Sequence, residues 1–317
     1  MKKYKEINEI LVNIPNSMPI YFAGHLKPDQ DSICSCLALA EFLKELGKEV
    51  YVLLEKKDNE LIAWYNNYSL ITEDINHKDY VFVALDVNEK NRLGVYEKAF
   101  DNANKTINID HHQNNKYESN YTLSLPGKSS TCEMVFNIIK TNGKQYLTQD
   151  ICALLYCGMM NDTNCFTRRL SNKSLSIAQT LINSRINYTD IIKKTYSQRS
   201  MYEFKALAKL VNEIQFDDFH YVVVDKNDEA FKDLTHNALV KGIAEDLRKI
   251  EGIDVFLMLI KQDNFIVAKT MTNFSERANL IAELFGGGGH KKEAGFTVEN
   301  VSIEEIVKKV KEYLNKN

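Results

Sequence analysis

The sequence has no large excess of positive or negative charge, few prolines and no long apolar run. Among its 317 residues, 40 Lys and Arg side chains nearly balance 43 Asp and Glu side chains, which gives a formal net charge of −3. A protein that grips long nucleic acid through its phosphates usually carries a basic excess, so a long duplex is excluded as the expected partner. A small anionic ligand held by a local site remains open.

Two further absences, of CxxC pairs and of long apolar segments, indicate the cellular compartment. None of the six cysteines belongs to a CxxC pair, which is typical of buried free thiols in a reducing cytosol. The first residues, MKKYKEINEILVNIPNS, lack the apolar core of a signal peptide, and no apolar run approaches the length of a membrane span. We therefore expect a cytoplasmic protein without a membrane partner.

Strand and helix patterns alternate along the first part of the chain. Apolar runs typical of buried strands occupy residues 19–25, 49–55, 80–87 and 105–112, and a helical pattern over 32–48 follows the first of them. This alternation predicts a mostly parallel sheet that is flanked by helices on both faces. Helical patterns then dominate from about residue 130 to residue 216.

A second set of elements begins near Asp218, and no Pro, Gly or Ser tract marks a flexible linker before it. Strands are expected at 219–225, 253–262 and 264–272, and helices at 229–250, 275–285 and 302–316. The predicted fold class is α/β, with an N-terminal domain over 1–190, a helical connector over 191–214 and a smaller α/β domain over 215–317.

Acidic and imidazole side chains gather where the predicted strands end. His25, Asp29 and Asp31 follow the first strand, Asp86 closes the third, Asp110, His111 and His112 close the fourth, and Asp162 follows an apolar helix. A lone Asp at such a position is usually a helix cap or turn residue. In an open parallel sheet, however, the ligand site lies outside the carboxyl ends of the strands, so these side chains are expected to meet at one edge.

Several carboxylates in one cleft repel one another unless cations neutralise them. Two divalent ions would do so, and a mixed imidazole and carboxylate set suits Mn²⁺, with Co²⁺ or Zn²⁺ as substitutes, better than an all-oxygen Mg²⁺ site. A carboxylate that bridges two such metals is the arrangement used for in-line attack on phosphorus. The spacing alone leaves open which acid bridges.

These segments resemble a known family. GHLKPDQDS, ALDV, NIDHH and GMMNDT are similar, in order and separation, to the four motifs of the DHH phosphoesterase superfamily, and AELFGGGGHKKEAGF resembles the glycine-rich signature of the DHHA1 domain. At this length the combination resembles the bacterial nanoRNase and pAp-phosphatase type, the shorter relatives of RecJ.

The resemblance implies a role for each motif residue. One metal is expected on His25, Asp29 and Asp86, and the second on Asp31, Asp86, His111 and Asp162, with Asp86 as the bridge and a bridging water as the nucleophile. His112 is expected beside the scissile phosphate, and Asp110 is expected to orient a histidine.

Substrate contacts are expected mainly from the glycine-rich segment. Gly286, Gly287, Gly288 and Gly289 would let backbone N–H groups approach a phosphate or base, with His290 beside them; the alternative is a plain glycine turn. Further candidates are Ser130 and Thr131, which alternatively cap a helix, and Arg168. Three positions depart from the family pattern: Gln30 replaces a common glycine, residues 269–273 lack an arginine for which Lys269 is the expected substitute, and Glu293 adds negative charge.

The implied function is a metal-dependent phosphoesterase. It would hydrolyse very short oligonucleotides, including pApA, to 5′-mononucleotides, and would also convert 3′-phosphoadenosine-5′-phosphate (pAp) to AMP. The alternatives are a family II-like inorganic pyrophosphatase, which PDQDSICS resembles, a cyclic di-AMP phosphodiesterase, and a non-catalytic nucleotide-binding protein. A homodimer is compatible with the resemblance.

Overall fold

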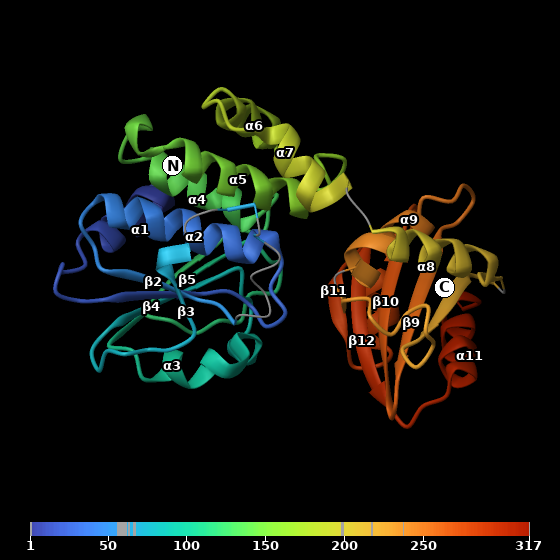
Figure 1. The fold of residues 1–317 in the computed structure, drawn as a ribbon. Helices are drawn as coiled ribbons and strands as arrows, with labels where there is room; N and C mark the ends of the chain where they lie inside the picture. Colours follow the sequence, from blue (N-terminus) through green and yellow to red (C-terminus); the bar gives the residue numbers. More distant parts are fainter. Residues whose placement is uncertain are drawn as a thin grey trace. The chain divides into compact units, whose positions relative to one another are not determined.

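The chain folds into two compact units, which are described separately (Figure 1). The computed structural model describes residues 2–55, 62, 64–65, 68–197, 200–216, 218–236 and 238–316. The N-terminal unit comprises residues 1–198 and the C-terminal unit residues 199–317, a division that falls inside the range 191–214 predicted as a connector.

The N-terminal unit is built on a parallel six-stranded sheet of order β3-β2-β1-β4-β5-β6. Its strands are β1 (Ile20–Ala23), β2 (Val50–Leu53), β3 (Ile71–Thr72), β4 (Val81–Leu85), β5 (Lys105–Asp110) and β6 (Tyr121–Ser124). The central strands β1 and β4 are buried along their whole length, which explains why they read as continuous apolar runs. The predicted α/β class with a mostly parallel sheet is confirmed.

Helices cover both faces of this sheet. They are α1 (Lys2–Val12), α2 (Gln30–Glu45), α3 (Glu97–Asp101), α4 (Thr131–Lys140), α5 (Gln149–Asp162), α6 (Ser174–Ile182) and α7 (Tyr188–Ile192), with shorter turns at Tyr68–Leu70, Lys90–Tyr96, Lys144–Tyr146 and Lys193–Ser197. In β1, Ile20 and Phe22 belong to the core on one face, whereas Tyr21 and Ala23 belong to the core on the other. Figure 1 shows α3 on the face of the sheet opposite α2.

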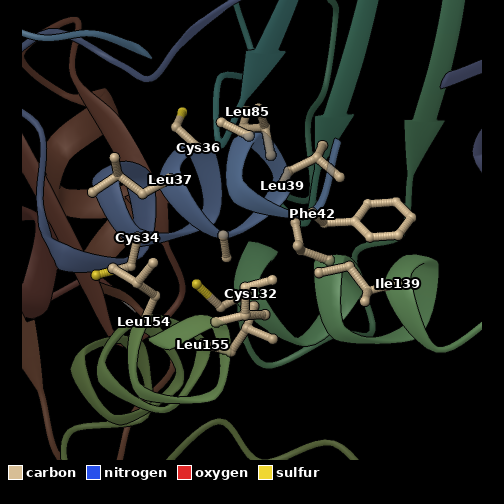
Figure 2. Close-up of a cluster of buried hydrophobic side chains, with 14 of the residues drawn as sticks. Cys34, Cys36, Leu37, Leu39, Phe42, Leu85, Cys132, Ile139, Leu154 and Leu155 are labelled. Carbon is tan, nitrogen blue, oxygen red and sulfur yellow. The ribbon is translucent and has the colours of Figure 1, made fainter. Parts of the chain in front are cut away.

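The larger core lies between the sheet and helices α2, α4 and α5. Figure 2 shows Cys34 and Leu37 of α2 near Cys132 of α4 and Leu154 of α5, all of them buried. Five of the six cysteines are buried free thiols and Cys165 is half-buried. This packing brings the first turns of α2 and α4 beside the last turn of α5, and these are the helix ends that carry motif residues.

The C-terminal unit contains a second six-stranded sheet of order β11-β12-β10-β9-β8-β7, in which only the β8–β9 pair is parallel. Its strands are β7 (Gln215–Phe216), β8 (His220–Asp225), β9 (Val255–Gln262), β10 (Phe265–Thr272), β11 (Gly288–His290) and β12 (Glu293–Glu299). Its helices are α8 (Met201–Asn212), a π-helical turn (Ala238–Ile243), α9 (Ala244–Leu247), α10 (Ala278–Glu283) and α11 (Ile303–Leu314).

Sequence patterns overestimated one helix in this unit and missed three strands, the short β7 together with β11 and β12. Of the helix expected over 229–250, the structure forms the π-helical turn Ala238–Ile243 and α9, whereas residues 229–233 form turns. The glycine-rich segment and the residues after it form β11 and β12, whose glycines carry no strand signal. No helix among the described residues is long and apolar enough to cross a membrane.

Candidate metal and phosphoester site

The loop after β1 brings His25, Asp29 and Asp31 to the carboxyl edge of the sheet. Asp29 is the N-cap of α2, and its Oδ1 accepts hydrogen bonds from the backbone N–H groups of Asp31 (3.0 Å) and Ser32 (3.1 Å). The His25 N–H donates to Ser32 Oγ at 3.1 Å. A side chain at Gly24 would clash with Ser32, so the close approach of strand and helix requires glycine there. Asp29 is thus a helix cap and also part of the acidic cluster.

Asp86 lies at the centre of the cluster. It follows β4 in the left-handed conformation, with φ of 62°, which is uncommon for a non-glycine residue. One carboxylate oxygen lies 3.6 Å from His25 Nε2, and the other lies 3.5 Å from His111 Nε2 and 3.6 Å from His112 Nδ1. With only 3% of its side chain exposed, Asp86 is surrounded by three imidazoles.

A second group forms deeper in the unit around Asp31. Asp31 is fully buried in the first turn of α2, and His111 Nε2 lies 3.0 Å from Asp162 Oδ2 at the end of α5. Ligand atoms of Asp31, His111 and Asp162 all lie within 4.8 Å of one another. A Cβ on Gly158 of α5 would come within 2.9 Å of the Asp31 carboxylate, so this glycine allows α5 to approach α2.

The donor set fits divalent cations. Three overlapping groups could each hold an ion: His25, Asp29 and Asp86; Asp31, His111 and Asp162; and Asp86, His111 and His112. Burial and neighbouring carboxylates raise the pKa of Asp31 to about 7 and that of Asp86 well above its ordinary value. Burial lowers the pKa of His25, which favours the neutral imidazole that ligates metals. Cations would stabilise these buried carboxylates in their charged form.

The charge of His111 responds to the same carboxylates. Burial alone would lower the pKa of His111, but the hydrogen bond to Asp162 and the charges of Asp86 and Asp31 raise it to about 10. His111 Nδ1 lies 3.2 Å from the Lys128 carbonyl oxygen, which orients Nε2 toward the acids. A protonated His111 and a bound cation would therefore serve as alternative positive charges at this position.

His112 and Asp110 form a separate pair at the end of β5. His112 Nδ1 lies 2.6 Å from Asp110 Oδ1, and Asn115 donates to Asp110 Oδ2 at 2.7 Å. Burial would raise the pKa of Asp110, but the hydrogen bonds from His112 and Asn115 hold it below its ordinary value. The His112 side chain is 25% exposed whereas Asp110 is fully buried, so the buried acid orients a solvent-accessible imidazole.

Ser130 and Thr131 contact protein groups at the start of α4. Ser130 is the N-cap, and its hydroxyl accepts from the Glu133 N–H. The Thr131 hydroxyl donates to Asp86 Oδ1 at 3.0 Å, and its N–H donates to Asp31 Oδ2 at 2.7 Å. The helix-capping alternative therefore describes Ser130, and Thr131 supports two acidic residues, a role that sequence reasoning missed.

The segment after Asp162 contacts the site through the side chain of Arg169, which bonds to the backbone of Asp162. Arg169 donates from Nε and Nη2 to the Asp162 carbonyl oxygen, at 3.2 and 2.8 Å. Arg168 is half-buried. Gln30, which replaces a common glycine, accepts from Asn161 Nδ2 at 2.8 Å and so links the first motif loop to the end of α5.

In the C-terminal unit, part of the glycine-rich segment terminates a helix. Gly286 has φ of 74°, and its N–H donates to the Glu283 carbonyl, while the Gly287 N–H donates to the Ala282 carbonyl. These bonds form a Schellman motif at the end of α10. Two of the four N–H groups expected to approach a ligand are thus used to close α10.

The remaining glycines lie in the edge strand β11. Gly288, Gly289 and His290 pair with β12, and a side chain at Gly288 would meet no atom within 4 Å. Lys269 forms an ion pair with Glu293, and each of these side chains is only 12% exposed. The extra acidic residue therefore neutralises the lysine that was expected to replace a phosphate-binding arginine.

Comparison with known proteins defines the class. The model of the DHH family N-terminal domain matches residues 19–159, and that of the DHHA1 domain matches residues 218–316. The chain therefore belongs to the DHH superfamily with a C-terminal DHHA1 domain, and it is a phosphoester hydrolase.

Several individual proteins are similar to this chain. The chain is 27% identical to a "Bifunctional oligoribonuclease and PAP phosphatase NrnA" of Thermus thermophilus, over 98% of this chain and 93% of that protein. It is 22% identical to the "Cyclic-di-AMP phosphodiesterase GdpP" of Geobacillus thermodenitrificans, over 95% of this chain but only 48% of that protein. The crystal structure of an exopolyphosphatase-related protein from Bacteroides fragilis has the same fold, with a TM-score of 0.86 and 22% identity over 100% of this chain and 96% of that one.

Proposed function

We propose that this protein hydrolyses very short oligonucleotides, including pApA, to 5′-mononucleotides, and that it also removes the 3′-phosphate of pAp. The convergence of His25, His111 and His112 on the buried Asp86 carboxylate carries this proposal. The similarity over nearly full length to the Thermus oligoribonuclease and PAP phosphatase supports the substrate class.

Two divalent cations would be held by the buried acids and imidazoles. We assign one to His25, Asp29 and Asp86 and the other to Asp31, Asp86, His111 and Asp162, with Mn²⁺ as the expected ion because the donors mix nitrogen and oxygen. When bound, such a pair of cations activates a water molecule for attack on phosphorus and neutralises the charge that develops there.

The other residues orient groups and move protons. Asp110 holds His112 at Nδ1, which fixes the tautomer and directs Nε2 to the reacting phosphate. His112 would donate a hydrogen bond to a phosphate oxygen or a proton to the leaving oxygen from Nε2. In the C-terminal unit, the open backbone at Gly288, two residues before His290, would offer room for a phosphate or base.

A cyclic di-AMP phosphodiesterase is the second candidate. The similarity to the Geobacillus phosphodiesterase favours it, and the chemistry at phosphorus would be the same. The two candidates differ in whether the scissile phosphate lies in a linear or a cyclic substrate, so they are separated by substrate comparison.

The test is a parallel hydrolysis assay with the full-length protein and Mn²⁺. The substrates are pApA, a short RNA, pAp, cyclic di-AMP and pyrophosphate, with EDTA as the blank and an Asp162→Asn variant as the control for contaminating nucleases. EDTA-sensitive release of AMP from pApA and pAp supports the proposal. Hydrolysis of cyclic di-AMP alone favours the second candidate, and release of phosphate from pyrophosphate alone refutes both.

A further inference from the structure

Glu133 is a fully buried carboxylate outside the proposed metal ligands. Its two oxygens accept hydrogen bonds from five donors: Ser129 N (3.1 Å), Ser129 Oγ (2.7 Å), Ser171 Oγ (2.8 Å), Ser174 Oγ (3.2 Å) and Lys128 Nζ (3.1 Å). Burial alone would raise the pKa of Glu133, but the hydrogen bonds from Ser129 and Ser171 and the charge of Lys128 hold it below its ordinary value. It is therefore a charged group inside the unit, which is costly unless its partners are fixed.

The bonds of Glu133 exceed what helix capping requires. In a capping box, the third residue of the helix returns a hydrogen bond to the N-cap N–H. Here the N-cap is Ser130, yet the Glu133 carboxylate bonds to Ser129, Lys128 and, across the unit, to Ser171 and Ser174 near the start of α6. Glu133 thus anchors residues 128–131, here termed the bracing loop, to a second segment.

The bracing loop in turn contacts three of the proposed metal ligands. The Lys128 carbonyl oxygen lies 3.2 Å from His111 Nδ1, and the Thr131 hydroxyl donates to Asp86 at 3.0 Å. The Asp31 carboxylate accepts from the N–H of Thr131 at 2.7 Å, and from that of the next residue of α4 at 2.9 Å. The N-terminus of α4 therefore fixes both oxygens of Asp31.

We propose that Glu133 and Thr131 are positioning residues, which hold Asp31, Asp86 and His111 in the geometry that binds the cations. Glu133 acts through the bracing loop, and Thr131 acts through its hydroxyl and its backbone N–H. The proposal rests on the metal site assigned above. Groups that orient metal ligands through hydrogen bonds typically contribute about 10–100-fold to metal affinity.

The test measures Mn²⁺ binding to the full-length protein by titration calorimetry, without substrate. Glu133→Gln keeps the size of the side chain but removes its charge, and we expect the dissociation constant to rise about 10–100-fold. The matched control is Glu245→Gln in the C-terminal unit, because Glu245 is also buried and forms an ion pair with Arg248 at 3.6 Å. Its affinity for Mn²⁺ should equal that of the wild type.

A second pair of variants separates positioning from folding. Thr131→Val removes the hydroxyl that Asp86 accepts from and keeps the shape of the side chain, whereas Thr131→Ser keeps the hydroxyl. We expect weaker Mn²⁺ binding for Thr131→Val and near wild-type binding for Thr131→Ser, with all variants folded by circular dichroism.

The outcomes separate a failure of the positioning role from a failure of the proposed metal site. If the wild type binds no divalent cation, the proposed site is refuted. If the wild type binds Mn²⁺ and both Glu133→Gln and Thr131→Val bind it equally well, the site stands and the positioning role is wrong. Equal weakening by Glu133→Gln and Glu245→Gln would also overturn it, because the effect would then be general destabilisation.

Discussion

Replacing Asp86 with Asn should stabilise the metal-free protein and reduce the stability that Mn²⁺ adds. Asn has nearly the size of Asp and still accepts the hydrogen bond from Thr131, but it carries no charge. In the metal-free protein, Asp86 is a buried carboxylate whose surroundings favour its neutral form, since its pKa is raised well above the ordinary value. In the unfolded chain the Asp86 carboxyl ionises freely at pH 8, whereas in the folded protein its ionisation is unfavourable. The free energy of unfolding of the wild type is therefore lowered at pH 8, and that of the Asn variant is not.

The size of the effect follows from the geometry. Ligand atoms of Asp29 and Asp86 lie within 4.8 Å, and two like charges at that distance repel by about 3 kcal/mol at an effective dielectric constant of 20. A protonated His111, 3.5 Å from Asp86, gives an attraction of similar size. Burial is the largest cost, and the charges of Asp31 and Asp162 add further repulsion that His111 does not offset, so we expect Asp86→Asn to stabilise the metal-free protein by about 1–3 kcal/mol.

Thermal unfolding at pH 8, in EDTA and in Mn²⁺, measures both effects. In EDTA the melting temperature of the Asp86→Asn variant should exceed that of the wild type by several degrees, at about 2–4 °C per kcal/mol for a unit of this size. At a Mn²⁺ concentration 100 times its dissociation constant, the wild type should gain about 2.7 kcal/mol, and the variant much less. A lower melting temperature of the variant in EDTA, or an equal gain in Mn²⁺, would refute the reasoning.

Three further predictions concern other parts of the molecule. His112→Gln should lower turnover of pApA by about 10²–10⁴-fold while Mn²⁺ affinity measured by calorimetry stays unchanged, because His112 is assigned to proton transfer; a loss of affinity would instead make it a ligand. Gly287→Ala should destabilise the protein by about 1–3 kcal/mol in urea unfolding, since the added Cβ would lie 2.8 Å from Phe296 Cα, and unchanged stability would contradict this packing. Glu293→Ala should release Lys269 from its ion pair and lower KM for pAp relative to pApA, whereas an unchanged ratio would exclude Lys269 from the phosphate site.

Local sequence patterns predicted the strands β1, β2, β4 and β5 of the N-terminal sheet and the placement of the acids, but not the short strands β3 and β6. Apolar runs at residues 19–25 and 80–87 contain β1 and β4, because strands buried on both faces must be apolar throughout. Since the carboxyl ends of parallel strands share one edge, His25 and Asp86 were expected to approach, and their side chains lie 3.6 Å apart. The clustering of these acids and imidazoles could therefore be predicted from strand ends and family motifs, and their role as metal ligands stays a prediction.

The supporting contacts depended on tertiary structure. Glu133 has the spacing of a capping-box residue, and nothing local indicates that Ser171 and Ser174 bond to it. Likewise, Lys269 and Glu293 are separated by 24 residues and meet only because β10 pairs with β12. The glycine-rich segment gave no strand signal, yet it pairs as β11.

The difference between what the sequence predicted and what required the tertiary structure has a physical reason. Hydrophobic periodicity and motif chemistry are properties of short segments, so the sequence by itself determined the α/β class, the parallel sheet and the residue types at its edge. Which donors satisfy a buried carboxylate depends on distances between segments far apart in the chain, and these arise only when the helices pack. The tertiary structure alone therefore decided that α4 holds Asp31, and that Glu133 holds the loop before α4.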